Sequence, residues 1–227
     1  MAQPLDPPVA RVPVTKERAM EVALALADGG GIEALSMRKL AKELGVEAAS
    51  LYHHVRNKDE ILDGLVELVS AEMPPPRRDV EWRVAMRERS QATREVLARH
   101  PWAVSLMASR MTPGPATLGH LDAGIGIMRD AGFPVELAAH GISLVDSYVH
   151  GFVLQEVNLP SKSTEELTAM TRAIMDQFPA NDFPHLFEVA VVNVLQPGYE
   201  YGAEFTYGLD LILDGLHAAL QREDPTP

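Results

Sequence analysis

Apolar residues recur along most of this chain at spacings of three and four positions, and this period restricts its fold more than any other feature. The spacing is clearest over residues 15–28 and 200–222. Such a run gives an α-helix one apolar face. No segment alternates convincingly with period two, as a half-buried strand would. We therefore expect an all-α fold of about nine or ten helices.

Glycine and proline divide the chain into helices. A first helix begins after Thr15 and ends at the three glycines 29–31, and Pro74-Pro75-Pro76 ends a longer helix that starts near Asn57. We therefore predict an N-terminal arm (1–14), a small helical domain (15–73) and a larger helical domain (77–227). In the larger domain we expect helices over 80–100, 102–110, 117–131, 134–158, 164–178 and 200–222, and one more near 184–195.

The absence of cysteine excludes disulfides, thiol nucleophiles, cysteine-ligated zinc and iron–sulfur clusters. No apolar run approaches the ~20 residues that a membrane-spanning helix needs. The first residues also lack the basic region and apolar core of a signal peptide. We therefore expect a cytoplasmic protein without a membrane partner.

The net charge of −12 argues against a protein that coats nucleic acid over its whole surface. The charge is uneven, however, because residues 36–58 carry five basic and two acidic side chains. A small positive segment on an acidic body suits a local contact with DNA. Chance variation over so few residues could give the same excess.

Residues 36–53 have the pattern of a helix of about nine residues and a second of about seven residues, joined by a tight turn. Gly45 supplies the positive φ that such a turn requires. The apolar residues then face the first helix, and the second helix turns its other side outward. This is the geometry of a helix-turn-helix, although a generic helical hairpin would show the same pattern. The core set is Leu40, Leu44, Val46 and Leu51, and the outward set is Ala48, Ala49, Tyr52 and His53.

The amino-acid sequence of residues 35–63 closely resembles the DNA-binding domain of the tetracycline-repressor (TetR) family. Its most specific parts are Leu51-Tyr52-x-His54-Val55-x-Asn57-Lys58 and Ile61-Leu62-Asp63. A looser resemblance to the C-terminal domain of the tetracycline-repressor subgroup continues through His100-Pro101-Trp102, Ala131-Gly132-Phe133 and Gly151-Phe152-Val153-Leu154. The resemblance implies a homodimeric repressor that binds a palindromic operator in double-stranded DNA and is released by a small-molecule effector.

The resemblance also implies which residues contact DNA. Arg38 resembles a base-reading residue, whose guanidinium can address guanine O6 and N7. Tyr52, His54 and Lys58 match phosphate-contacting positions, and His53 could touch a base or the backbone. Tyr52 could instead pack in the core, and His54 could instead cap a helix. The full expected set is Ser36, Met37, Arg38, Ala48, Ala49, Ser50, Tyr52, His53, His54 and Lys58.

In this family the C-terminal helices form a dimer interface and an effector pocket. We expect the interface on the helices 134–158 and 200–222. Four glycines inside these helices cost about 1 kcal/mol each, which close helix packing would explain, as would helix ends or kinks; they are Gly141, Gly151, Gly208 and Gly215. Pocket candidates are large apolar and lone polar residues, namely Trp102, Met107, His120, Tyr148, Phe152 and Asn158.

Three drug-contact positions of the tetracycline-binding members differ here. The loop 111–115 has no histidine, Gln155 stands where a carboxylate is expected, and the position of another histidine falls within 73–75. We therefore expect a different small, partly apolar effector, with no metal and no cofactor.

Two other functions remain open at this point. Asp146 and His150 are neighbours on one expected helix, with Glu156 further along, and such a pair could act as a general base or half a metal site. The chain has none of the H-E-x-x-H, G-x-S-x-G, P-loop or dinucleotide motifs, so we expect no catalytic residues and no enzyme. An architectural DNA-binding protein without an effector is the second alternative.

Overall fold

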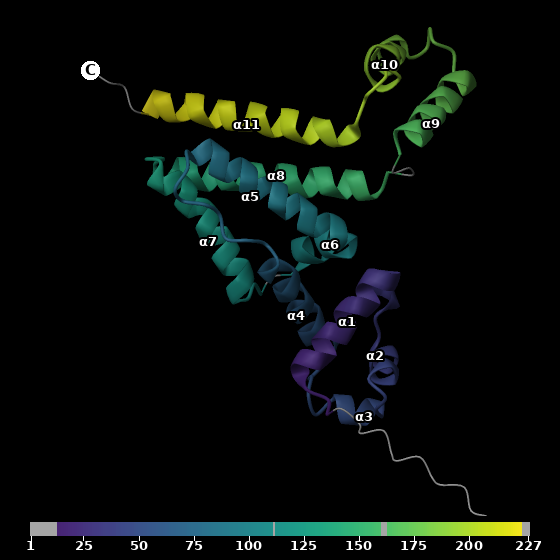
Figure 1. Ribbon diagram of the computed structural model, residues 1–227, viewed down its shortest axis with the longest axis vertical. Coiled ribbons are helices and arrows are strands. Elements are labelled where there is room, and N and C mark those ends of the chain that lie inside the picture. The colour runs from purple at the N-terminus through teal and green to yellow at the C-terminus, as the bar shows by residue number, and fades with distance from the viewer. Residues whose placement is uncertain (1–12, 111, 160–162, 224–227) are drawn as a thin grey trace, which may run out of the picture.

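The computed structural model describes residues 13–110, 112–159 and 163–223, and within these ranges the fold is all-α, as the sequence predicts. The expected N-terminal arm, apart from residues 13 and 14, lies outside the described residues, as do Met111 and residues 160–162 of two expected loops. Figure 1 shows α1 to α3 at one end of the molecule, α5 to α11 toward the other, and α4 between them. Among the described residues, no helix is both long and apolar enough to cross a membrane.

The N-terminal part follows the predicted order of helices. Thr15 and Asn57 cap two of them, since their side-chain oxygens accept the N–H groups of Arg18 (3.2 Å) and Glu60 (2.9 Å). These bonds explain where the helices begin. The elements are α1 (Lys16–Gly30), the 3-10 turn η1 (Ile32–Ala34), α2 (Met37–Glu43), α3 (Ala48–Leu51) and α4 (Lys58–Ala71).

The turn between α2 and α3 confirms the prediction for Gly45, which has a φ of 68°. The expected seven-residue second helix is wrong, because α3 is an α-helix over four residues only. After it, the N–H groups of His53 and His54 bond three residues back, to Ser50 (3.2 Å) and Leu51 (2.9 Å). The segment therefore ends in tight turns rather than further α-helix.

The C-terminal part contains seven α-helices among the described residues. Expected and observed bounds agree within two residues, except that the helix near 184–195 is a short α-helix continued by a π-helical turn. The elements are α5 (Trp82–Arg99), α6 (Pro101–Ser109), α7 (Pro115–Asp130), α8 (Val135–Val157), α9 (Thr164–Gln177), α10 (Pro184–Val189), the π turn η2 (Ala190–Val194) and α11 (Tyr201–Glu223).

The two longest helices, α8 and α11, lie side by side across the top of Figure 1. Gly208 permits this approach, because a Cβ there would collide with the Tyr148 ring of α8. A Cβ on Gly141 would likewise collide with Met128, so close packing explains two of the four glycines. Gly151 and Gly215 have no neighbouring atom within 4 Å of a Cβ position, so packing within the described chain does not explain them.

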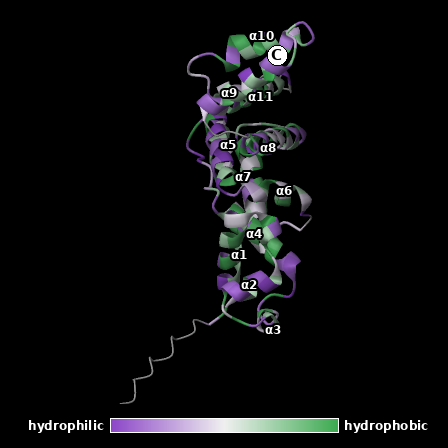
Figure 2. Cartoon of the chain, turned by 90° about the vertical axis from the view of Figure 1, so that its right-hand side faces the viewer, coloured by the Kyte–Doolittle hydropathy of each residue, from purple (hydrophilic) through white to green (hydrophobic). Residues whose placement is uncertain are grey.

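Helix α4 joins the two parts of the molecule. Its buried residues Ile61 and Leu65 belong to one continuous apolar core, and the helix contacts α1 as well as α6 and α7. Figure 2 shows α4 between the small N-terminal end and the larger helical body. The division at the triple proline stays a prediction, and the two predicted domains share this packing.

Candidate functional site

The surface formed by α2, α3 and the start of α4 carries the residues expected to touch DNA. Figure 1 places α3 at the end of the molecule farthest from α8 and α11. Tyr52 is 52% exposed, so the alternative that it packs in the core is wrong. Met37 and Ala48 are half-buried against the core of the small domain. The other expected residues are exposed: Ser36, Arg38, Ala49, Ser50, His53, His54 and Lys58.

Two polar residues of this surface have distinguishable local roles. Ser36 caps α2, because its hydroxyl oxygen accepts the N–H of Lys39 at 3.2 Å. The alternative that His54 caps a helix finds no support, since its side chain makes no hydrogen bond to a described residue and Asn57 caps α4. The His54 ring is therefore available to an external partner.

The positive charge of this surface is largely uncompensated. Arg38, Lys39, Lys42 and Lys58 are exposed and form no ion pair within the described part of the chain. The fifth basic residue, Arg56, bonds to Glu60, which Lys16 also reaches at 2.5 Å. The Lys16 hydrogen bond is the main reason that the pKa of Glu60 falls to about 2. Cations without internal partners are what phosphate binding requires.

A cavity of about 630 Å³ lies among α4, α5, α6, α7 and α8. Its wall is mostly apolar, with a few polar side chains, which is the usual character of a small-molecule site. Met107 and His120, both expected in a pocket, belong to this wall. The apolar lining includes Met73, Val104, Met107, Leu121 and Leu154, and the polar lining Ser70, Thr93, Thr117, His120, Asp146 and His150.

One polar group of the cavity is His120, on α7. Its Nε2 atom lies 3.4 Å from the Thr93 hydroxyl of α5. Burial, together with the nearby positive charge of Arg89, lowers the pKa of His120 to about 4. The ring is therefore uncharged at neutral pH.

A second set of polar contacts joins α5 to α8. The buried Arg89 guanidinium, 1% exposed, donates to the Asp146 carboxylate at 2.7 Å. The His150 Nδ1 atom bonds instead to the main-chain oxygen of Asp146, also at 2.7 Å. Asp146 and His150 are neighbours on α8, as their spacing predicts. The Asp146 carboxylate is bound to Arg89, however, and does not orient the His150 imidazole as it would in a general-base pair.

The other four pocket candidates do not line this cavity. The Trp102 indole donates to Asp28 of α1 at 2.8 Å, and the Tyr148 hydroxyl donates to the main-chain oxygen of Glu204 in α11 at 3.0 Å. Phe152 stacks on Tyr201, with centroids 5.1 Å apart. The Asn158 side chain bonds to the main-chain oxygen of Leu154 (2.7 Å) at the end of α8. The first three residues therefore join helices, Asn158 bonds within the end of α8, and none of the four belongs to the cavity wall.

The cavity is also lined by Ser70, Thr93 and Thr117, which are not among the pocket residues predicted from the sequence. They lie on three different helices, and no spacing along the chain joins them. Asp146 and His150 did carry a signal, their separation of four positions, but it pointed to a different chemistry. Among the described residues, no group of three histidine, aspartate or glutamate side chains could hold a metal ion.

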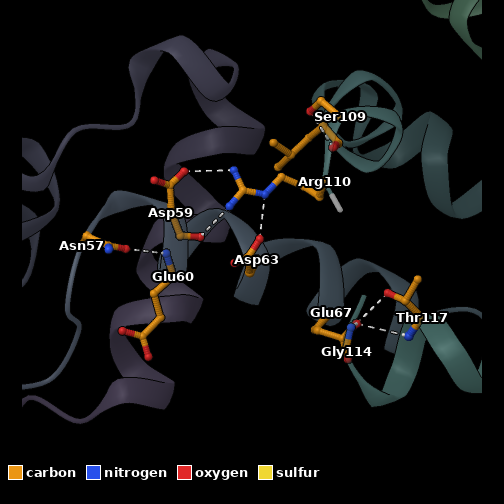
Figure 3. A network of polar contacts seen from close by, with 10 residues as sticks. Asn57, Asp59, Glu60, Asp63, Glu67, Ser109, Arg110, Gly114 and Thr117 are labelled. Atoms are coloured by element: carbon orange, nitrogen blue, oxygen red, sulfur yellow. Dashed lines mark hydrogen bonds and ion pairs between the residues drawn. The ribbon is translucent and has the colours of Figure 1, made fainter. Parts of the chain in front are cut away.

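The junction of α6 and α7 is fixed to α4 by two sets of polar contacts (Figure 3). Arg110, directly after α6, donates to Asp63 at 2.6 Å and to Asp59 at 3.0 Å. Glu67, one turn further along α4, accepts the first N–H groups of α7, including those of Gly114 (3.1 Å) and Thr117 (3.2 Å). Burial alone would raise the pKa of Glu67, but the bonds from the Thr117 hydroxyl and these N–H groups hold it below its usual range.

Comparison with known protein families gives two matches that together cover most of the chain. Residues 19–65 match the model of bacterial regulatory proteins of the tetR family. Residues 74–220 match the model of the tetracyclin repressor-like C-terminal domain. The first match covers the α2–α3 surface, and the second covers most of the cavity.

Individual relatives are similar over nearly their whole length. The HTH-type transcriptional repressor DrrR1 of Streptomyces coeruleorubidus is 30% identical over 94% of this chain and 82% of its own. The class A tetracycline repressor of Escherichia coli from transposon 1721 is 30% identical over 87% of this chain and 88% of its own. The crystal structure of Streptomyces coelicolor ActR with actinorhodin has a TM-score of 0.80 and 28% identity, and covers 93% of this chain and 99% of that one.

Proposed function

This chain belongs to the TetR family of bacterial transcriptional regulators, and we propose that it represses transcription and that an effector bound in the cavity of α4 to α8 releases it from its operator. Members of the family bind operator DNA as dimers. The observation that carries the proposal is that α4 borders both sites. Its first residue, Lys58, lies on the DNA-facing surface, and Ser70 and Met73 near its other end line the cavity.

We assign different roles to the residues of the DNA-facing surface. Arg38 is exposed at the start of α2, where its guanidinium can make a bidentate contact with guanine. Phosphate contacts, which fix the register of the protein on DNA, suit the exposed Tyr52 and His54 after α3 and the exposed Lys58 at the start of α4. Ala49 and Ser50 can touch base edges from the exposed side of α3, and alanine reads only a thymine methyl group.

The effector would act on DNA binding through α4. Three carboxylates of α4 contact the α6–α7 junction at intervals of one turn, namely those of Asp59, Asp63 and Glu67. Ser70, at the next turn, lines the cavity. An effector that moves α6 or α7 would therefore shift α4, and with it the distance between the two α3 segments of a dimer. Loss of the correct half-site spacing would lower operator affinity.

A second cavity of about 490 Å³ lies among α5, α6, α8, α9 and α11, and it suits this role less well. None of the residues that line it belongs to α4. A ligand there could not press directly on the DNA-binding part. The α4-bordered cavity is therefore the better effector site.

We propose an effector other than a tetracycline–magnesium complex. Gln155 does not line the α4-bordered cavity, and its side-chain oxygen lies 3.4 Å from the Tyr201 hydroxyl. The neighbouring Glu156 is bound to Arg94. A small-molecule effector of another kind is supported by the likeness to ActR, whose crystal structure contains actinorhodin. A regulator of this kind would act in the cytoplasm, where the chromosome lies.

Operator selection from random double-stranded DNA tests the proposal. The full-length dimer should enrich a palindrome with half-sites in successive major grooves. The same complex is then challenged with a small-molecule library, and at least one compound that binds the protein should release the DNA. Failure to enrich any sequence would refute the repressor function. Enrichment without release by any bound compound would favour the architectural alternative, and turnover of a library compound would favour an enzyme.

A further inference from the structure

The direction of the hydrogen bonds around the cavity limits which hydrogen-bonding groups of an effector find a partner. The Thr93 hydroxyl donates its one hydrogen to the main-chain oxygen of Arg89 at 2.9 Å. Its contact with His120 Nε2 therefore needs the hydrogen on that nitrogen. Since the ring is uncharged, Nδ1 carries none, and it has no partner among the described residues. His120 thus offers a hydrogen-bond acceptor.

The polar residues of α8 that line the cavity also present hydrogen-bond acceptors. A main-chain oxygen can only accept, so the His150 bond to Asp146 places the hydrogen on Nδ1. With its hydrogen on Nδ1, the uncharged form of the ring presents Nε2 as an acceptor. The Asp146 carboxylate, which receives Arg89 on Oδ1, keeps Oδ2 as a further acceptor. Both side chains line the cavity.

The contribution of α4 is again an acceptor. The Thr117 hydroxyl donates to Glu67 at 2.5 Å, so its contact with the Ser70 hydroxyl at 3.0 Å requires Ser70 to donate. The Ser70 oxygen therefore has lone pairs but no hydrogen for a ligand. Ser105 and Ser147 also line the cavity, and their hydroxyls can rotate to match either kind of partner.

From this polarity we infer that the effector is an uncharged, largely apolar molecule that donates hydrogen bonds through hydroxyl groups to His120, His150, Asp146 and Ser70. The inference rests on the proposed function and specifies the chemistry of its site. A carboxylate or phosphate would face the free Asp146 oxygen and find no committed donor on the lining. A cation is disfavoured because Arg89 already neutralises Asp146. The apolar lining accommodates the remaining body of the molecule.

Matched stilbenes test the inference. trans-3,4′,5-Trihydroxystilbene and its trimethyl ether share one skeleton, but only the first donates hydrogen bonds. trans-Stilbene-4,4′-dicarboxylate serves as the anionic probe. Isothermal titration calorimetry of the full-length protein should show the trihydroxy compound binding at least tenfold more tightly than the ether or the dicarboxylate, because burying an unmatched acceptor is unfavourable.

Two variants show whether the preference for the trihydroxy compound comes from hydrogen bonding or from its smaller size. Ser70→Ala and His150→Phe each remove an acceptor, so the preference for the trihydroxy compound should fall several-fold in each. His185→Phe makes the same exchange at an exposed residue of α10, whose side chain is 95% exposed, and should keep the full preference. Circular dichroism and operator binding show whether each variant is folded.

Three results would overturn the inference. One is equal or tighter binding of the ether or the dicarboxylate. Another is a preference that both acceptor variants retain in full. The last is a folded, operator-binding protein that does not bind the trihydroxystilbene at micromolar concentration. In each case operator binding without ligand is measured on the same sample, so the proposed repressor function is judged separately.

Discussion

The Glu67 carboxylate of α4 accepts both the hydroxyl and the main-chain N–H of Thr117 on α7, at 2.5 and 3.2 Å. The carboxylate also receives the N–H of Ala116 at 2.7 Å, so one side chain of α4 satisfies the open N-terminus of α7. Negative charge is favourable at this end of a helix. The contact joins the helix that carries Lys58 to the helix that carries His120.

Glu67→Ala should lower the free energy of unfolding by about 1–3 kcal/mol, because α7 loses its cap and partly buried N–H groups lose their acceptor. Urea denaturation measures the change. Glu21→Ala, at an exposed position of α1, is the control and should change stability by less than about 0.5 kcal/mol. Equal effects of the two substitutions would contradict the capping role.

His120 should make stability depend on pH below neutrality. Its folded pKa of about 4 lies below the ordinary value of 6.5, so the unfolded chain binds more protons between these values and stability falls as pH falls. Between pH 7 and pH 5 the loss should be about 2 kcal/mol. His120→Gln should lose less over this range, whereas His185→Gln should behave as the unaltered protein does. A histidine titration by NMR with a midpoint near 6.5 for His120 would refute this.

Arg38→Ala should reduce affinity for the preferred operator by about 1–3 kcal/mol, and much less for operators altered at one base pair per half-site. The reason is that a bidentate guanine contact reads a single base pair. Fluorescence anisotropy against a set of single-base operator variants checks this. Equal weakening on every variant would make Arg38 a backbone contact.

Lys58→Ala should weaken binding almost evenly across operator sequences, since a phosphate contact carries no base information. The slope of log affinity against log salt should become shallower by about one for each phosphate that is no longer neutralised, or about two per dimer. Measurements at several salt concentrations give the slope. An unchanged slope would place Lys58 away from the phosphates.

Leu211→Glu should convert the dimer to monomers and abolish tight operator binding. Tyr207 and Leu211 are 67% and 57% exposed and share one face of α11 with Gly215, beside which there is open space. An apolar face of this kind is suited to a second copy of the chain. Leu118→Glu on α7, where the leucine is 52% exposed, is the control. A Leu211→Glu protein that remains dimeric by light scattering at micromolar concentration would place the interface elsewhere.

The positions of most helices, and the exposure of most residues around α2 and α3, could be predicted from the sequence. The helix caps at Thr15 and Asn57 and the turn at Gly45 involve only groups a few residues away. They can therefore be predicted from the order of residues alone. The exposed residues of the helix-turn-helix follow for the same reason, since a short helix has only one side to bury. The predicted length of α3 is wrong, because a helix end depends on weak local bonds.

The residues that line the cavity could not be predicted from the sequence, because helices far apart along the chain form it. Five helices enclose it, and its polar residues Ser70, Thr93 and His150 are separated by tens of positions in the chain. The sequence predicts large aromatic residues such as Trp102 and Phe152 there, but the energy of apolar burial does not depend on which helices do the burying. The direction of each hydrogen bond likewise follows from partners on other helices, as between Thr93 and His120, and no local pattern in the sequence specifies it.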